Sequence, residues 1–378
     1  MSGSIGPLLS ADESFTHQIV DTFATVSQSD LSWTEKVCGM AAARDGSLQI
    51  GFGLGKYTNR NVFDGYAGVS RGVEQWTVRG SRHLLPDADT LGVGPILYEV
   101  VDPLRSVRVR LDANDIVPIA YDLLFESIVP CVVEEREDRR TLNQVRATAN
   151  QVRYHQTGRA SGWVEVEGTR TEITPDTWIS TRDHSWGVRP DVGSELVDLE
   201  PDPTESLVPN VLAIWNPVFF ERTDGSTYAY HHYVLDLSGP GFVHRKVQGG
   251  FEYADAAREP IVDVTPELRF NRDNSRLLGG SYIIRMADGT DRRLEIEAIS
   301  DTGFHLGTGL YLGFDGQHHG SWRGPLHLDG EYFENCADPA TAERINQFRD
   351  CMVRVRDTQT GARGWGNCQT FVRGDRLG

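Results

Sequence analysis

Short β segments separated by turns recur along almost the whole chain, and this pattern limits the folds that it can adopt. About 18–20 segments of alternating or β-branched and aromatic character follow one another at intervals of about 8–12 residues. Only residues 340–351 show the spacing of apolar side chains that predicts a helix. Such a pattern is typical of β-sandwiches and β-barrels. We therefore predict an all-β protein with antiparallel sheets and very little helix.

Proline and acidic residues concentrate at residues 196–209 and divide the predicted strands into two halves of similar size. We interpret this stretch as a linker. The predicted organisation is then an N-terminal surface segment at 1–30, a first β-barrel domain at 31–195 and a second at 210–378. The charged run at 134–140 has no apolar periodicity, which favours a solvated face and leaves a loop or a lid as the alternative.

The charge and residue usage of the chain argue against several classes of function. A formal net charge of −17 disfavours nucleic acid and anionic membrane surfaces as partners. We find no apolar run of about 18 residues and no secretion-signal pattern, so we expect no membrane span. The five cysteines are far apart and form no C-x-x-C pair, which favours a reduced, cytoplasmic protein. Only three lysines are present, which argues against Schiff-base chemistry.

The densest group of reactive side chains lies at residues 182–189, directly after a predicted strand. If the strand continues, Arg182, His184 and Trp186 face one side, and Asp183 faces the other. Histidine suits general acid–base catalysis near neutral pH, and a tryptophan ring could shield a developing cation. An arginine could hold a phenolate, carboxylate or enolate oxygen. The alternative is a buried polar cluster whose histidine and aspartate satisfy backbone groups.

Residues 182–189, together with 162–166 and the strand at 121–125, are similar to the hydroxyneurosporene synthase (carotenoid 1,2-hydratase) and AttH-like superfamily. Weaker similarity extends over residues 93–109. The resemblance implies two successive lipocalin-like β-barrels. It also implies cofactor-free chemistry on hydrophobic small molecules, such as hydration of isoprenoid alkenes, cyclisation, isomerisation or lyase reactions. No feature marks carotenoids in particular, and a fold carries over more safely than a reaction.

Two further strands carry candidate site residues. Asp122 and Glu126 share a strand face, where two carboxylates could form an acid/base pair or could instead pair with arginines. In the run at 228–233, Tyr230 and His232 share a face that could line a pocket for an aromatic or polyene ligand. The ordinary β-propensity of tyrosine is the alternative. Adjacent histidines on a strand point apart and no carboxylate stands at ligand spacing, so no metal is expected.

The sequence therefore predicts an enzyme without a cofactor. We expect a lyase, hydratase, dehydratase or isomerase that acts on a hydrophobic, aromatic or isoprenoid small molecule near the barrel junction. The alternatives are a lipocalin-like carrier that does not transform its ligand, and a scaffold that forms homodimers. The candidate catalytic residues are His184, Asp183, Asp122 and Arg182. The candidate substrate-binding residues are Trp186, Arg189, Trp163, Tyr121, Tyr230 and His232.

Overall fold

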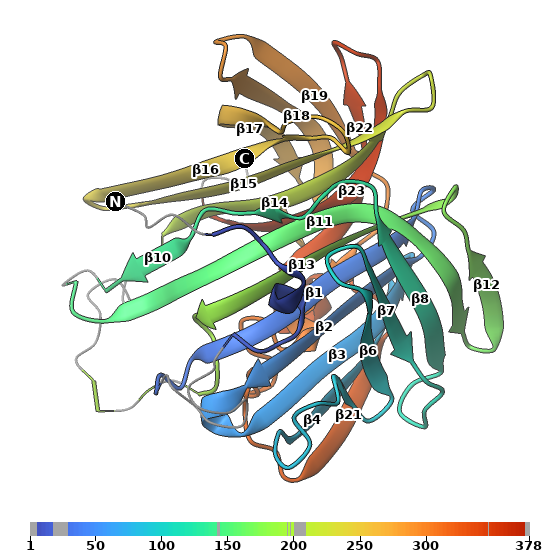
Figure 1. The fold of residues 1–378 in the computed structure, drawn as a ribbon, viewed down its shortest axis with the longest axis vertical. Coiled ribbons are helices and arrows are strands. Elements are labelled where there is room, and N and C mark those ends of the chain that lie inside the picture. The colour runs from blue at the N-terminus through green and yellow to red at the C-terminus, as the bar shows by residue number, and fades with distance from the viewer. Residues whose placement is uncertain are drawn as a thin grey trace.

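Two large antiparallel sheets make up nearly all of the structure (Figure 1). The structure is a computed structural model that describes residues 6–17, 29–141, 144–194, 196, 198–199, 209–346 and 348–374. The first sheet contains 14 strands and the second contains nine. The predicted all-β fold with very little helix is confirmed. Most of the predicted linker at 196–209 lies outside the described residues.

The first sheet comes mainly from the first half of the chain. Its strands follow the order β21-β4-β3-β2-β1-β13-β11-β8-β7-β6-β5, and β9, β10 and β12 pair with β11. Their bounds are β1 Trp33–Ala43, β2 Gln49–Tyr57, β3 Val62–Arg71, β4 Glu74–His83, β5 Gly92–Val93, β6 Ile96–Asp102, β7 Ser106–Leu111, β8 Ile119–Ser127, β9 Val132–Val133, β10 Glu137–Arg140, β11 Ala147–Val166, β12 Thr169–Ile173, β13 Trp178–Val188 and β21 Leu326–Phe333. The sheet encloses one apolar core, which includes Phe52, Trp76 and Phe125.

The second sheet closes on itself. Its order is β19-β18-β17-β16-β15-β14-β23-β22-β20, and an additional pairing of β19 with β22 completes a barrel. The bounds are β14 Asn210–Glu221, β15 Thr227–Gly239, β16 Phe242–Glu252, β17 Glu259–Phe270, β18 Leu277–Met286, β19 Asp291–Ala298, β20 Phe304–His305, β22 Arg349–Asp357 and β23 Arg363–Arg373. A second apolar core, which includes Phe251 and Tyr282, fills the interior. Both sheets agree with the predicted lipocalin-like barrels.

One part of the second half of the chain belongs in space to the first sheet. Strand β21 pairs with β4 along its whole length. The 3-10 turn η3 (Leu306–Gly309), which lies between β20 and β21, is held by a hydrogen bond of 2.9 Å from the Arg79 side chain to the Thr308 carbonyl. The two halves of the sequence are therefore interlocked, because the first sheet ends on a strand that follows most of the second barrel.

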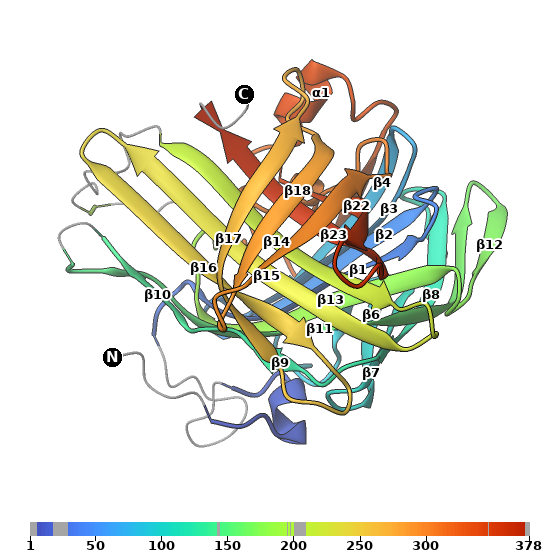
Figure 2. The ribbon, with the colours of Figure 1, turned by 90° about the horizontal axis from the view of Figure 1, so that it is seen from above.

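The strands at the centre of the molecule are buried on both faces. Every residue of β2 is buried, and in β1 only Trp33 is partly exposed. One face of β1 and β13 lines the first barrel, and the other meets the second sheet, which lies across it in Figure 2. The apolar part of this contact is formed by Met40, Ala42, Ile179, Phe219 and Met352. Polar side chains of these strands are therefore shielded from solvent on either side.

Two local predictions differ from the structure. The helix expected at 340–351 is limited to α1 (Pro339–Arg344), since Asn346 adopts a left-handed φ of 52° and a strand follows. The charged run at 134–140 is not a solvated face throughout. Glu134 is only 5% exposed, and arginine and tryptophan side chains compensate for this burial by donating hydrogen bonds to its carboxylate.

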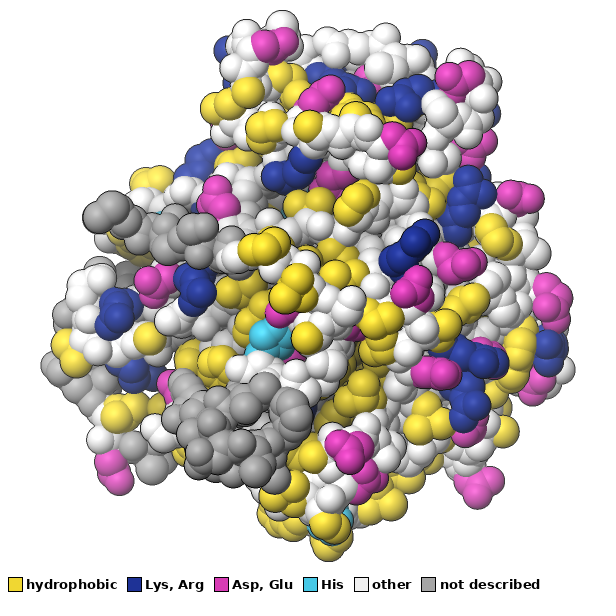
Figure 3. Space-filling view, viewed as in Figure 1, with side chains coloured by type: hydrophobic (Ala, Val, Ile, Leu, Met, Phe, Trp, Pro, Cys, Tyr) yellow, Lys and Arg dark blue, Asp and Glu magenta, His cyan; other side chains and the backbone are white. Residues whose placement is uncertain are grey.

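The outer surface carries both signs of charge. Basic and acidic side chains are interspersed over the face shown in Figure 3. Some form ion pairs between strands, as Arg245 does with Asp236 and Asp263. Among the described helices, none is long and apolar enough to cross a membrane.

Candidate active site

Strand β13 carries the predicted motif and separates two polar regions. Its side chains alternate between faces, as the sequence predicted. Arg182 and His184 point into the first barrel, while Asp183 lines a cavity toward the second sheet. We name the group in the first barrel the barrel cluster; it consists of Glu13, Glu35, Tyr154, Arg182 and His184. We name the hollow between the sheets the junction cavity.

A buried ion pair holds the barrel cluster together. Arg182 donates to the two carboxylate oxygens of Glu13 at 2.7 and 2.8 Å. Glu13 also accepts hydrogen bonds from the Tyr154 hydroxyl and the Leu104 backbone. Burial raises the pKa of Glu13, but the hydrogen bonds and charges of Arg182 and His184 outweigh it and hold the pKa well below its usual value. The 3-10 turn η1 (Ser10–Glu13) is thereby fixed against β11 and β13 (Figure 1).

Both ring nitrogens of His184 have partners inside the protein. Nδ1 lies 3.1 Å from the Tyr154 hydroxyl, and Nε2 lies 3.1 Å from Glu35 Oε1. Glu35 also contacts His17, whose ring stacks on Trp186 with 3.6 Å between the ring centres. Burial lowers the pKa of His184, but the nearby carboxylates of Glu13 and Glu35 raise it overall. His184 thus has no free nitrogen to offer a ligand in this arrangement.

The junction cavity lies on the opposite side of β13 and has a volume of about 200 Å³. Strands β1 and β13 contribute Lys36 and Asp183 to its walls. The second barrel contributes Trp215 and Tyr233, and Arg189 follows β13 at one edge. The walls therefore combine charges of both signs with aromatic rings, as many ligand sites do.

Lys36 extends from β1 toward the junction cavity and is only 1% exposed. Its side-chain nitrogen lies 2.7 Å from His319 Nε2 and 4.0 Å from the centre of the Tyr311 ring. Burial, with a smaller contribution from the charge of Arg189, lowers the pKa of Lys36 to about 7. Burial and the charge of Lys36 lower the pKa of His319 to about 4, so His319 is neutral near pH 7. Such a lysine supplies an uncharged amine near neutral pH.

Asp183 lies on the same face as Lys36, since β1 and β13 pair Lys36 with Ser185 and Cys38 with Asp183. No hydrogen bond engages the Asp183 carboxylate among the described residues. Burial raises its pKa, and the charges of Arg153 and Arg189 offset part of that rise. The cavity thus joins an amine whose pKa is lowered with a carboxyl whose pKa is raised, an arrangement that suits proton transfer.

A second buried carboxyl, Asp350, lies behind the cavity wall. It accepts hydrogen bonds from the side-chain amides of Asn367 at 3.2 Å and Gln369 at 3.1 Å. Burial raises its pKa to about 7 in spite of these two hydrogen bonds. Gln369 lines the cavity, so the Asp350 carboxyl is linked to it through one side chain.

Two of the other predicted site residues lie on the outer face of the first barrel. Asp122 forms an ion pair with Arg108, which is the alternative that the sequence left open. Trp163 pairs with Asp122 across β8 and β11, and the Arg170 guanidinium lies 4.3 Å from its ring centre. The structure places both residues away from the barrel cluster and from the junction cavity.

Three more predicted residues lie inside the barrels. Tyr121 is in the core of the first barrel, and Tyr230 and His232 are inside the second. Their hydroxyls and both His232 ring nitrogens have no hydrogen-bond partner in the part of the chain that the structure describes. Burial lowers the pKa of His232 to about 3. None of these residues belongs to the barrel cluster, and none lines the junction cavity.

The sequence reasoning missed Lys36, although the strand that carries it offered a signal. The run at 33–43 is otherwise largely apolar or small, and a charged side chain in a strand buried on both faces is costly. Lys36 could therefore have been selected from the sequence as a candidate site residue. Glu13 gave no comparable signal, because the segment around it has no periodicity and its partner is far away in the sequence.

Comparisons with known proteins place the chain in an uncharacterised group. Residues 8–374 match a model described as "Family of unknown function (DUF8625)". No curated protein matches the chain. Among solved structures, it is similar to an AttH-like protein from Nitrosomonas europaea, with 12% identity, a TM-score of 0.49, and coverage of 89% of this chain and 92% of that one. It is also similar to kievitone hydratase from Nectria haematococca, with 8% identity, a TM-score of 0.43, and coverage of 90% and 88%.

Proposed function

The chain belongs to DUF8625, a family of unknown function, and we propose from its junction cavity that it is a proton-transferring enzyme, namely a hydratase, lyase or isomerase. One observation supports this proposal most strongly. The buried amine of Lys36, with a pKa of about 7, shares the cavity with the Asp183 carboxyl, whose pKa is raised. Perturbed pKa values of opposite kinds in one hollow are characteristic of acid–base sites.

In this proposal Lys36 is the general base. Near its pKa, a large fraction of the amine is uncharged and can accept a proton from the substrate, or from a water molecule that adds to it. His319, at 2.7 Å, orients the amine. Asp183 then gives a proton to another atom of the substrate. Because Lys36 removes one proton and Asp183 returns one, the reaction causes no net gain or loss of protons and no change of oxidation state.

The walls of the cavity indicate a class of substrate. Arg139, Arg153 and Arg189 line it and suit a carboxylate, phenolate or enolate oxygen, while Tyr233 and Tyr311 offer aromatic faces. A volume of about 200 Å³ is below the range of about 300–1,000 Å³ that is usual for sites of drug-sized ligands. We therefore propose a compact substrate that has one ring and one acidic oxygen.

Proton transfer can be tested before the natural substrate is known. The protein would be incubated in D₂O with a panel of small phenolic and unsaturated carboxylic acids, and solvent deuterium in each compound would be followed by NMR. We expect at least one compound to gain deuterium or to be converted. The rate should fall at least about 10²-fold in a Lys36→Met variant.

The same experiment separates the enzyme from a carrier. Saturable binding of a compound, seen as ligand line broadening, without deuterium uptake or conversion would favour the carrier. Deuterium uptake that is unchanged in a folded Lys36→Met variant would contradict the proposed role of Lys36.

A further inference from the structure

A second group of titratable side chains is buried between the sheets and is not part of the lining of the junction cavity. Glu134 follows β9, His155 lies on β11 and His231 lies on β15. They are 5%, 0% and 1% exposed, respectively. One ligand atom from each residue lies within 4.8 Å of the other two. Three distant parts of the chain thus bring two imidazoles and one carboxylate to the same point.

The distances within this group suit a metal ion. Glu134 Oε1 lies 3.1 Å from His155 Nδ1 and 3.6 Å from His231 Nε2. A zinc ion that binds N and O ligands at about 2.0–2.1 Å in a tetrahedron separates neighbouring ligand atoms by about 3.3 Å. These two separations lie on either side of this value. The His155 and His231 rings pack against each other, with 3.7 Å between their centres, so the His231 ring would turn to aim a nitrogen at the ion.

His231 points independently to a ligand. Neither of its ring nitrogens makes a hydrogen bond within the described residues, although its side chain is almost fully buried. An unsatisfied buried imidazole is costly, and a metal bond would remove that cost. Glu134 and His231 also line a cavity of about 130 Å³, which has room for a water molecule beside the ion.

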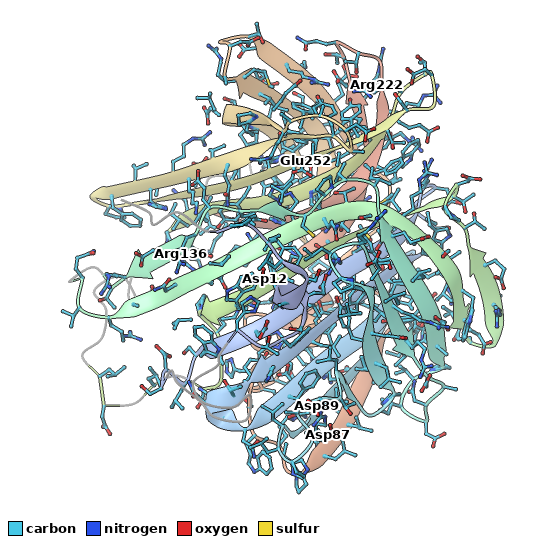
Figure 4. All side chains as sticks on the ribbon, in the orientation of Figure 1. Asp12, Asp87, Asp89, Arg136, Arg222 and Glu252 are labelled. Atoms are coloured by element: carbon cyan, nitrogen blue, oxygen red, sulfur yellow. The ribbon has the colours of Figure 1, made fainter. Side chains whose placement is uncertain are left out.

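The surrounding contacts are those of a prepared metal ligand. His155 Nε2 lies 2.8 Å from Glu252 Oε1. Glu252 is the last residue of strand β16 in the second sheet and is labelled in Figure 4. Metal-binding histidines usually donate their other ring N–H to a carboxylate in this way. The Glu134 carboxylate is fixed by hydrogen bonds from Arg153 and the Trp215 indole. Its orientation is therefore set before any ion binds.

We propose that Glu134, His155 and His231 form a binding site for a divalent transition-metal ion. Zinc fits the ligand types and their spacing best, with a water molecule from the adjoining cavity as the fourth ligand. The proposal goes beyond the function inferred above, because this site has its own cavity and the proton transfer at Lys36 does not require it.

The test is titration of the metal-free full-length protein with Zn²⁺ by calorimetry and with Co²⁺ by visible absorption. We expect one site per chain, with a Co²⁺ spectrum of low coordination number. His231→Asn should weaken binding at least about 100-fold. The matched control is His232→Asn, since His232 is adjacent on β15 but points into the second barrel and should leave binding unchanged.

A Glu252→Gln variant keeps the test decisive if His231→Asn does not fold. It leaves all three ligands in place and should weaken binding by about 10–100-fold. The proposal is overturned if the wild-type protein binds no ion at one equivalent. It is also overturned if folded His231→Asn or Glu252→Gln binds as tightly as wild type. A third outcome would also overturn the proposal, namely loss of binding in a His17→Asn variant while His231→Asn still binds. The ion would then belong to the group of His17, Glu35 and His184.

Discussion

The two faces of β13 carry similar kinds of side chains but surround them differently. On the barrel side, Arg182 and His184 make hydrogen bonds to Glu13, Glu35 and Tyr154 within the protein. On the cavity side, the pKa values of Lys36 and Asp183 are shifted toward neutrality by burial beside a hollow. Breaking a fully paired buried charge destabilises a fold, whereas a desolvated group at a cavity is available to a ligand. Burial alone therefore does not mark a functional site. A buried polar group marks one when it lies beside a cavity where a ligand can reach it.

The largest effect on stability should come from breaking the barrel cluster. Arg182→Met leaves the Glu13 carboxylate buried without its main partner, which should reduce the free energy of unfolding by about 3–5 kcal/mol. Urea denaturation would measure this loss. Asp183→Asn, one residue away on the other face, is the matched control and should change stability far less. An equal loss in the free energy of unfolding of the two variants would show that the two faces of β13 do not differ in this way.

The next effect concerns the pH dependence of stability on the cavity side. Asp350 has its pKa raised to about 7 by burial, so the folded protein keeps a proton that the unfolded chain loses near pH 4. The stabilisation from this group is therefore present at low pH and is lost as the pH rises from about 4 to 7, by a few kcal/mol. Asp350→Asn should remove that slope. Urea denaturation from pH 4 to 8 that shows the same slope in both proteins would refute the assignment.

Substitutions on the cavity face of β13 should reduce activity more than substitutions on the barrel face, which is the reverse of their expected effects on stability. We expect Asp183→Asn to reduce kcat/KM at least about 10²-fold, since it removes the proposed proton donor. His184→Asn should reduce it only a few-fold once the folded fraction is equalised, because both His184 ring nitrogens are already engaged. Steady-state rates on a compound found by deuterium uptake would measure both. A larger loss in His184→Asn would move the chemistry to the barrel cluster, as the sequence first suggested.

The smallest effect is expected outside both regions. Asp122 pairs with Arg108 at the surface of the first barrel, and exposed ion pairs contribute less than about 1 kcal/mol. Asp122→Asn should therefore change the urea midpoint only slightly and leave deuterium uptake at the wild-type rate. A rate loss of tenfold or more would show that a site exists on this outer face.

The fold could be predicted from the sequence because its signal is local. Alternation, turns and the scarcity of helix each need only a few neighbouring residues, and the assignment of Arg182 and Asp183 to opposite faces needs only strand geometry. The structure confirms these predictions. The pairing of β21 with β4 could not be predicted, because it joins segments that are far apart in the sequence and no local pattern encodes it.

The candidate site was predicted only in part, for the same reason. Asp183 and Arg189 line the cavity, and a motif of reactive residues was enough to select them. Lys36 was passed over because its pKa depends on burial between two sheets, which no spacing encodes. Glu134 was assigned to a solvated run, although Arg153 and Trp215 reach it from other strands.

The state of Lys36 tests the central claim most directly, and the chain is well suited to the measurement. It contains only Lys36, Lys56 and Lys246, so labelling lysine with ¹³C at the ε position gives three resonances that can be followed by NMR from pH 5 to 11. We predict that the resonance missing from a Lys36→Met variant titrates with a pKa of about 7. If that resonance instead titrates near the ordinary lysine value of about 10.4, Lys36 is not a base at neutral pH and the proposed role of the junction cavity is contradicted.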